Sequence, residues 1–220
     1  WSNGAMDLSN PERRLYRVEL DLGTSEGAPV PETQSFRPVT NSSDITDDGV
    51  YLIAVELNGK YYVTNNVPTD TSNYYYLTGV EVASDENGVI HSESVMSYTW
   101  SITLKDGGYE FYSDNMVKNG VNGVLLISQG GSGMFSGEDG YEGKAWYVTP
   151  STADGYSSAQ QPRRYWDIEL DGEGHAVLRN KYDREVGMFP CYKYCTSHNY
   201  FTLCFEGGSD KAEIQLLKLM

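Results

Sequence analysis

The feature that most constrains the fold is a repeated stretch that begins with tryptophan. One copy, "WSITLKDGGYEFYSDN", starts at Trp100, and the other, "WDIELDGEGHAVLRN", starts at Trp166. Each reads Trp-x-Ile-x-Leu, then a glycine-containing turn, then a second run that ends in Asn. Apolar residues that recur at every second position are typical of a half-buried β-strand. Each copy therefore predicts two strands joined by a turn, and the repetition predicts a chain built from similar units.

The same series of strands recurs and predicts three units of four strands each. The first strands are "YLIAVEL" from Tyr51, "YEFYSDN" from Tyr109 and "HAVLRN" from His175. Further runs rich in β-branched and aromatic residues, which favour strands, follow each of them. The predicted second, third and fourth strands are "KYYVT", "YYYLTGVEV" and "YTWSITL"; "GVLLIS", "KAWYVT" and "RYWDIEL"; and "EVGMFP", "YFTLCF" and "AEIQLLKL".

Twelve strands in three four-strand units are what a β-trefoil requires, because six strands close its barrel and six cap one end. The third unit fits less well, since Ala212 stands where the other two units have Trp100 and Trp166. The predicted fold class is therefore all-β and β-trefoil-like, with an unrepeated β-sandwich as the alternative. The predicted units cover residues 48–106, 107–172 and 173–220.

Residues 1–47 differ from the rest of the chain. "LYRVELDLG" alternates like one half-buried strand, and "TSEGAPVPETQ" after it has the Pro, Gly and polar composition of a linker. One strand cannot form a domain, so we expect this segment to pad the main domain or to end a preceding one. The predicted domain is 48–220, and the abrupt start at Trp1 is typical of a mature form or of a piece of a larger multidomain chain.

The charge excludes several classes of partner. The formal net charge is −15, from 16 Lys and Arg against 31 Asp and Glu. Such a chain cannot build the basic surface that nucleic acid or an anionic membrane requires. No run approaches the roughly 18 apolar residues of a membrane span, so we also expect no membrane insertion.

Catalytic patterns are lacking, so the sequence predicts no enzyme, no cofactor and no metal. The histidines are His91, His175 and His198, and we expect His175 to be a satisfied, half-buried histidine at a core-facing position equivalent to Tyr51 and Tyr109. The chain has no Gly-x-Ser-x-Gly nucleophile elbow. Most acidic residues stand beside Gly in segments such as "DGEG", where turn formation is their expected role.

Three cysteines, Cys191, Cys195 and Cys204, lie close together in the sequence. They allow one disulfide in three pairings, or three buried thiols that act as small apolar side chains. Cys195 and Cys204 flank the segment "TSHNYFTL", where we expect a hairpin.

"GVYLIAVELNGKYYVTN" and the Trp-x-Ile that ends a unit are similar to β-trefoils of the ricin-B-like lectin family. The stretch "DGEGHAVLRNKYDREVGMF" and the terminal "IQLLKL" resemble modules of large secreted or wall-bound proteins of gut bacteria. The resemblance covers about 48–220 and implies an extracellular, lectin-like adhesion module. Ricin-type sugar sites carry Gln-x-Trp, whereas this chain has Tyr98-Thr99-Trp100 and Arg164-Tyr165-Trp166, so the sugar site of the family is not carried over.

The candidate ligand-binding residues are Tyr74, Tyr75, Tyr141 and Trp146. Tyr74 and Tyr75 belong to a run of three tyrosines that must point to both faces of a strand, so at least one ring is expected to be exposed, and Tyr141 and Trp146 flank the long Gly- and Ser-rich insertion. Amphipathic rings on Gly- and Ser-rich loops suit carbohydrate stacking or a protein interface, although rings also fill strands. We therefore expect a non-catalytic binding or adhesion module of an extracellular bacterial surface protein, which binds glycans or a host surface protein. The alternatives are a structural spacer without ligand and a carboxylate-dependent glycoside hydrolase.

Overall fold

The computed structural model of the chain is all-β. It describes residues 34–66, 77–86, 89–105, 107–118, 121–129, 146–151, 158, 161–181, 191–197, 199–204 and 211–220. Within these residues one 15-stranded antiparallel sheet is formed, and the helices are short 3-10 turns. The all-β prediction is therefore confirmed. The predicted strand within "LYRVELDLG" lies outside the described residues.

Most of the observed elements coincide with the predicted strands. The strands are β1 (Ser35–Pro38), β2 (Gly49–Leu57), β3 (Lys60–Thr64), β4 (Leu77–Val82), β5 (Ile90–His91), β6 (Trp100–Lys105), β7 (Gly108–Lys118), β8 (Val121–Gln129), β9 (Trp146–Ser151), β10 (Trp166–Leu170), β11 (His175–Asn180), β12 (Cys191–Cys195), β13 (Tyr200–Cys204), β14 (Lys211–Ala212) and β15 (Ile214–Leu219). The 3-10 turns are η2 (Ser42–Asp44), η3 (Ser92–Ser94), η4 (Met96–Tyr98) and η5 (Gln161–Arg164).

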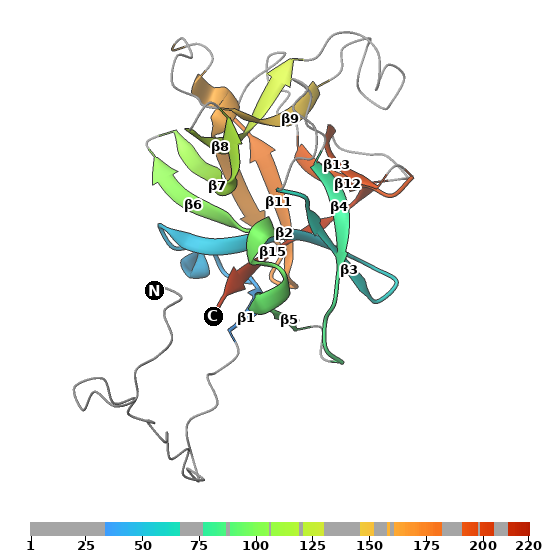
Figure 1. Cartoon of the computed structure of the whole chain (residues 1–220). Coiled ribbons are helices and arrows are strands. Elements are labelled where there is room, and N and C mark those ends of the chain that lie inside the picture. Colours follow the sequence, from blue (N-terminus) through green and yellow to red (C-terminus); the bar gives the residue numbers. More distant parts are fainter. Residues whose placement is uncertain are drawn as a thin grey trace, which may run out of the picture. The chain divides into compact units, whose positions relative to one another are not determined.

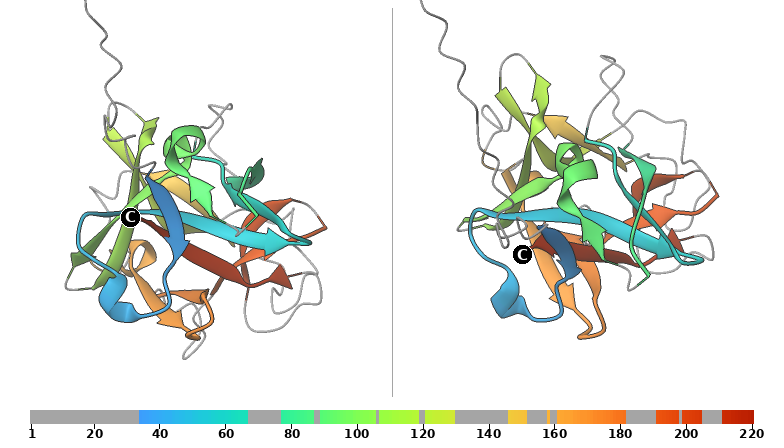
Figure 2. Two further views of the ribbon diagram at one scale, coloured as in Figure 1. Left: turned by 90° about the horizontal axis from the view of Figure 1, so that it is seen from below. Right: turned by 60° about the horizontal axis from the view of Figure 1, so that its bottom comes forward.

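Six of the strands pair in a closed circuit. β2 pairs with β6, β6 with β7, β7 with β10, β10 with β11, β11 with β15, and β15 again with β2, all antiparallel. Figure 1 shows β6 and β7 side by side, and Figure 2 shows β15 running beside β2. The sheet therefore has no free edge along these six strands, since each of them has a partner on both sides.

Three of these six strands each continue into a further pair. β2 pairs with β3, and β3 pairs with β4. In the same way β7 continues into β8 and β9, and β11 into β12 and β13. β4 also pairs with β13, and β13 contacts β9, so the last strands of the three series are neighbours. In Figure 1, β12, β13 and β4 lie together accordingly.

Two short strands extend the sheet beyond β15. β1 pairs with both β15 and β5, and Phe36 of β1 is buried in a second apolar cluster with Leu52, Ile90 and Leu217. Residues 35–38 lie before the predicted domain start at residue 48, yet they belong to the same sheet as the predicted domain.

The main core lies inside the six-strand circuit and contains both tryptophans of the repeat. Trp100 and Trp166 are fully buried. Each indole still satisfies its N–H, because Trp100 Nε1 donates to Thr64 Oγ1 at 2.8 Å and Trp166 Nε1 donates to the Leu125 carbonyl at 3.0 Å. A buried indole needs such a partner, so both rings are fixed by packing and by a hydrogen bond.

The cross-strand register corrects the alignment of the third unit. Tyr51 stands opposite Trp100 and Tyr109 opposite Trp166, while the matching pair in the third unit is Ala176 opposite Ile214. Ile214, rather than Ala212, therefore occupies the tryptophan position. The equivalence of His175 with Tyr51 and Tyr109 was wrong for the same reason: the β10–β11 turn holds one residue more than the β6–β7 turn.

The second strand of the third unit also differs from the prediction. "EVGMFP", at 185–190, lies outside the described residues, and the strand that pairs with both β11 and β13 is β12, Cys191–Cys195. Charge and cysteines in "CYKYC" hide the strand pattern, because Lys193 breaks a run that is otherwise aromatic and apolar.

Glycines at two tight turns adopt positive φ values that other residues rarely adopt. Asn58 and Gly59 join β2 to β3 with φ of 54° and 75°, the positive values that a two-residue Asn-Gly hairpin turn requires. Gly108 begins β7 with φ of 130°, and a Cβ there would lie 2.9 Å from the Trp166 carbonyl oxygen. Glycine therefore permits the close approach of β7 to β10, one of the six pairings of the circuit.

Candidate functional site

The predicted ligand-binding residues occupy the same topological position in two of the three units. Tyr74 and Tyr75 belong to the connection between β3 and β4, and Tyr141 belongs to the connection between β8 and β9. All three lie outside the described residues. Trp146 begins β9, opposite Gln129, but its side chain is not among those described. Both connections join the second strand of a series to its third strand.

The first of these connections ends at β4, and β4 lies against the β12–β13 turn. The backbone N–H of Gly79 in β4 donates to the carbonyl oxygen of Asn199 at 3.0 Å. Asn199 adopts a φ of 54°, a conformation that Asn tolerates better than most residues. A Cβ on Gly79 would lie 2.6 Å from Asn199 Oδ1 and 2.9 Å from Tyr194 Cε2, so the approach depends on glycine.

Aromatic rings and polar groups lie together at this place, and we call them the β4 aromatic surface: Tyr62, Glu81, Tyr194, Asn199 and Phe201. Tyr62 stacks on Tyr194 with ring centroids 6.0 Å apart, and Phe201 meets Tyr194 edge-on at 5.0 Å. Tyr194 donates to Asn199 Oδ1 at 2.5 Å, and Tyr62 donates to Glu81 Oε2 at 3.3 Å.

Burial is uneven across the β4 aromatic surface. Tyr194 and Phe201 are buried in the core, and burial raises the pKa of the Tyr194 hydroxyl. Tyr62 is half-buried, and Glu81 is exposed and ion-paired with Lys60. The arrangement thus presents a partly exposed ring, fixed by a buried one, beside a carboxylate and an amide. Aromatic rings that carry or adjoin hydrogen-bonding groups are enriched at binding interfaces.

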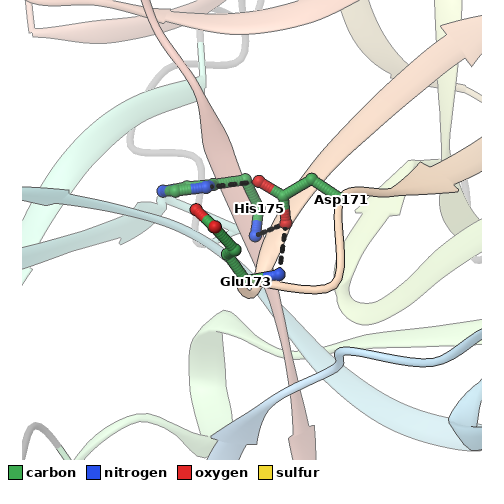
Figure 3. A group of neighbouring side chains, drawn as sticks. All are labelled: Asp171, Glu173 and His175. Carbon is green, nitrogen blue, oxygen red and sulfur yellow. Dashed lines mark hydrogen bonds and ion pairs between the residues drawn. The ribbon is translucent and has the colours of Figure 1, made fainter.

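A second group of functional side chains lies on the β10–β11 turn. Asp171, Glu173 and His175 each offer a ligand atom, and these atoms lie within 4.8 Å of one another. Figure 3 shows the three side chains on the turn, where the Asp171 carboxylate is bonded to the His175 ring and to the backbone N–H of Glu173. Carboxylates and imidazole are the residue types that bind divalent transition metals. The signal in the sequence is the spacing Asp-x-Glu-x-His at residues 171–175, which is also typical of a turn.

The hydrogen bonds of Asp171 explain the arrangement without a metal. One carboxylate oxygen accepts the backbone N–H of Glu173 at 2.7 Å and that of His175 at 3.1 Å, which closes the turn. The other oxygen lies 2.7 Å from His175 Nδ1. The expectation that acidic residues beside Gly form turns is confirmed here. A metal would have to displace the bond between Asp171 and His175, on a turn that is open to solvent.

The electrostatics of this turn do not suit a general acid. The hydrogen bond from His175 lowers the pKa of the Asp171 carboxyl, aided by the backbone N–H groups. A general acid in glycoside hydrolysis needs a raised pKa instead. His175 is half-buried and bonded to Asp171, as expected of a satisfied histidine, but its side chain is 45 % exposed and does not face the core.

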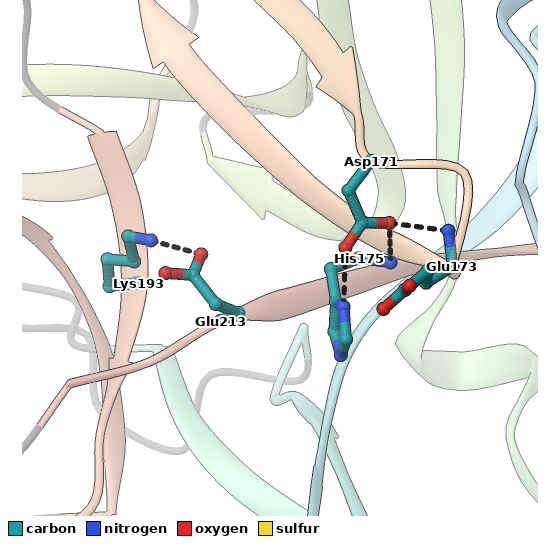
Figure 4. Close-up of polar contacts among 5 residues, drawn as sticks. All are labelled: Asp171, Glu173, His175, Lys193 and Glu213. Carbon is teal, nitrogen blue, oxygen red and sulfur yellow. Dashed lines mark hydrogen bonds and ion pairs between the residues drawn. The ribbon is translucent and has the colours of Figure 1, made fainter.

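Neighbouring charges around this hairpin are paired. Lys193 of β12 bonds to Glu213, which immediately precedes β15, and Figure 4 draws this pair together with the turn residues. On the hairpin itself, Asp167 pairs with Lys181 at 3.0 Å and Glu169 with Arg179 at 3.4 Å. These acidic groups therefore neutralise nearby cations and tie strands together.

Titration of Asp171 should reveal this local network. Because the folded pKa of Asp171 is lowered, its contribution to stability is present above the unfolded pKa and is lost as the pH falls through the folded value. Carboxyl-carbon NMR shifts should give a pKa for Asp171 below the ordinary range, and His175→Ala should move it upwards. Glu169, which lies on the same hairpin but pairs with Arg179 instead of His175, serves as the internal control. An Asp171 pKa that His175→Ala leaves unchanged would contradict the assignment.

The remaining histidines and acidic residues either contact a neighbouring group or lie outside the described residues. His91 is exposed with Nε2 3.8 Å from Asp85, and His198 lies outside the described residues. Asp47, in the segment "DITDDG", accepts the backbone N–H of Leu104 at 2.8 Å. This bond ties the turn that precedes β2 to β6.

Comparison of the chain with protein-family models, with curated proteins and with solved structures gives no match. In the described ranges, the 3-10 turns fall far short of the length and apolar character of a membrane-spanning helix.

Proposed function

We propose that residues 48–220 form a β-trefoil that serves as a non-catalytic binding module of an extracellular bacterial surface protein, with glycans as ligands. The closed six-strand circuit supports the trefoil, because each of its units contributes two strands to the circuit and a further pair outside it. Repetition of the buried Trp100 and Trp166 at matching register supports it too.

The observation that carries the binding proposal is the β4 aromatic surface. It adjoins the first residues of β4, where the connection that contains Tyr74 and Tyr75 ends. A half-buried Tyr62 is held in place by stacking on the buried Tyr194, so the ring needs little ordering when a ligand binds. Glu81 and Asn199 lie beside it, and the lone pairs of the carboxylate and the amide that remain after they accept from Lys60, Tyr62 and Tyr194 suit the hydroxyl groups of a sugar.

A glycan array with the complete chain is the direct test. We expect binding to a defined set of glycans, and we expect Tyr62→Ala, Tyr75→Ala and Trp146→Ala each to weaken it by roughly 5- to 150-fold, since loss of one stacking ring costs roughly 1–3 kcal/mol. Tyr112→Ala is the matched control, because Tyr112 is a half-buried ring on β7 that bonds to Asp48 and does not belong to the β4 aromatic surface.

Other outcomes would decide between the alternatives. Glycan binding that survives all three substitutions would contradict the β4 aromatic surface as the site and place the site elsewhere on the molecule. An array without any bound glycan, together with capture of one purified host surface protein, would favour the protein ligand, and failure of both would favour a spacer. Release of reducing sugar from a bound glycan would indicate a hydrolase and contradict the proposed non-catalytic role.

A further inference from the structure

The register of β12 and β13 places two of the three cysteines opposite each other. Cys191 is the cross-strand partner of Cys204, and Cys195 is the partner of Tyr200. Directly opposite residues of an antiparallel pair have Cα atoms about 4.5–5.5 Å apart and lie on the same face of the sheet. That separation falls within the range of about 4.4–6.8 Å found for disulfide-bonded cysteines.

The same register excludes the two other pairings. Cys191 and Cys195 are four residues apart in one strand, which separates their Cα atoms by about 13 Å. Cys195 and Cys204 are displaced by the same length, because Tyr200 is the partner of Cys195. Cysteines with Cα atoms more than about 7 Å apart cannot be bridged without movement of the backbone.

We propose that Cys191 and Cys204 form a disulfide that fastens the β12–β13 hairpin. Cys195 remains a thiol, fully buried, with Sγ 3.3 Å from Ser197 Oγ. The hairpin forms the third series outside the circuit, and β13 pairs with β4, so the bridge would also stabilise the support of the β4 aromatic surface. The proposal rests on strand register and is independent of any ligand.

The bridge forms by thiol–disulfide exchange with a small disulfide such as oxidised glutathione. The thiolate of one cysteine attacks a glutathione sulfur, which gives a mixed disulfide and releases one glutathione thiolate. The second cysteine thiolate then attacks the protein sulfur of the mixed disulfide and expels the other glutathione. Two cysteine thiols are oxidised and one glutathione disulfide is reduced to two thiols, and the two protons that the cysteine thiols lose are taken up by the two glutathione thiolates.

Peptide mapping without reductant tests the proposal on the complete chain after equilibration with oxidised glutathione. We expect one cross-linked peptide pair that joins Cys191 to Cys204, a mass lower by two hydrogens than that of the reduced chain, and one thiol titratable only after denaturation. Three titratable thiols in the denatured chain, or a cross-link that includes Cys195, would overturn the proposal.

Thermal unfolding of variants provides the second measurement. Cys195→Ala should keep the cross-link, whereas the double variant Cys191→Ser/Cys204→Ser should lose it. For a loop of this length, loss of the bridge should lower the Tm of a chain of this size by about 6–12 °C. Reductant should lower the Tm of the wild type and of Cys195→Ala but leave that of the double variant unchanged; equal sensitivity of all three would contradict the assignment.

Discussion

Trp100→Ala should destabilise the protein by about 3–5 kcal/mol, the range for removal of a fully buried aromatic side chain. Trp100 is buried inside the six-strand circuit, and the cavity left by its ring would be lined by residues of several strands. The substitution also removes the N–H donor to Thr64, whose side chain is itself fully buried. For a chain of this size, we expect the Tm to fall by roughly 6–20 °C.

Chemical and thermal unfolding of a graded series would check this expectation. Trp100→Phe keeps most of the apolar volume but leaves the Thr64 hydroxyl without its donor, so about 1–3 kcal/mol should be lost. Leu104→Ala is the control, since Leu104 lies in the same strand but is 60 % exposed and should change the stability by about 0.5 kcal/mol or less. Equal losses for Leu104→Ala and Trp100→Ala would contradict the placement of Trp100 in the core.

Removal of the Glu110 carboxylate should be the next most damaging change. Glu110 in β7 bonds to Arg164 at the end of η5, and both side chains are largely buried. Glu110→Ala would leave the Arg164 guanidinium with little water and without this acceptor, which we expect to cost about 2–4 kcal/mol. Because β10 begins directly after this segment, the pair also fixes the approach of β10 to β7.

A double-mutant cycle separates the interaction energy of the Glu110–Arg164 ion pair from the cost of lost packing. If the cost of Glu110→Ala arises from a stranded charge, Glu110→Ala/Arg164→Ala should be more stable than the sum of the single losses predicts. Glu81→Ala is the matched control, because the Glu81–Lys60 pair is exposed and its loss should leave the Tm near that of the wild type. Strictly additive losses in the Glu110–Arg164 cycle would show that the two side chains do not interact.

The strands that follow strict alternation could be predicted from the sequence. β3 and β11 have the predicted bounds, and the hairpin turn at Asn58-Gly59 has the positive φ values that its residues favour. These elements are defined locally, by alternation and by turn chemistry, so one segment of sequence suffices to identify them.

What could not be predicted depends on partners distant in the sequence. One additional residue in the β10–β11 turn moved Ala176, rather than His175, into the core, and a one-residue shift exchanges the faces of a strand. Likewise β12 is defined by its pairing with β11 and β13, and its own composition gives a weak signal. The β4 aromatic surface is assembled from two series of strands, so no single segment contains its pattern.

Backbone NOEs across the six strand pairs of the circuit test the central claim most directly. The decisive pairs are Tyr109–Trp166, where β7 meets β10, and Ile53–Leu216, where β15 meets β2, because these contacts join first and fourth strands that are distant in the sequence. A β-trefoil predicts interstrand NOEs at both, together with the four other pairings. NOEs missing at both positions, with the strands divided into two separate sheets, would contradict the closed circuit and indicate a β-sandwich.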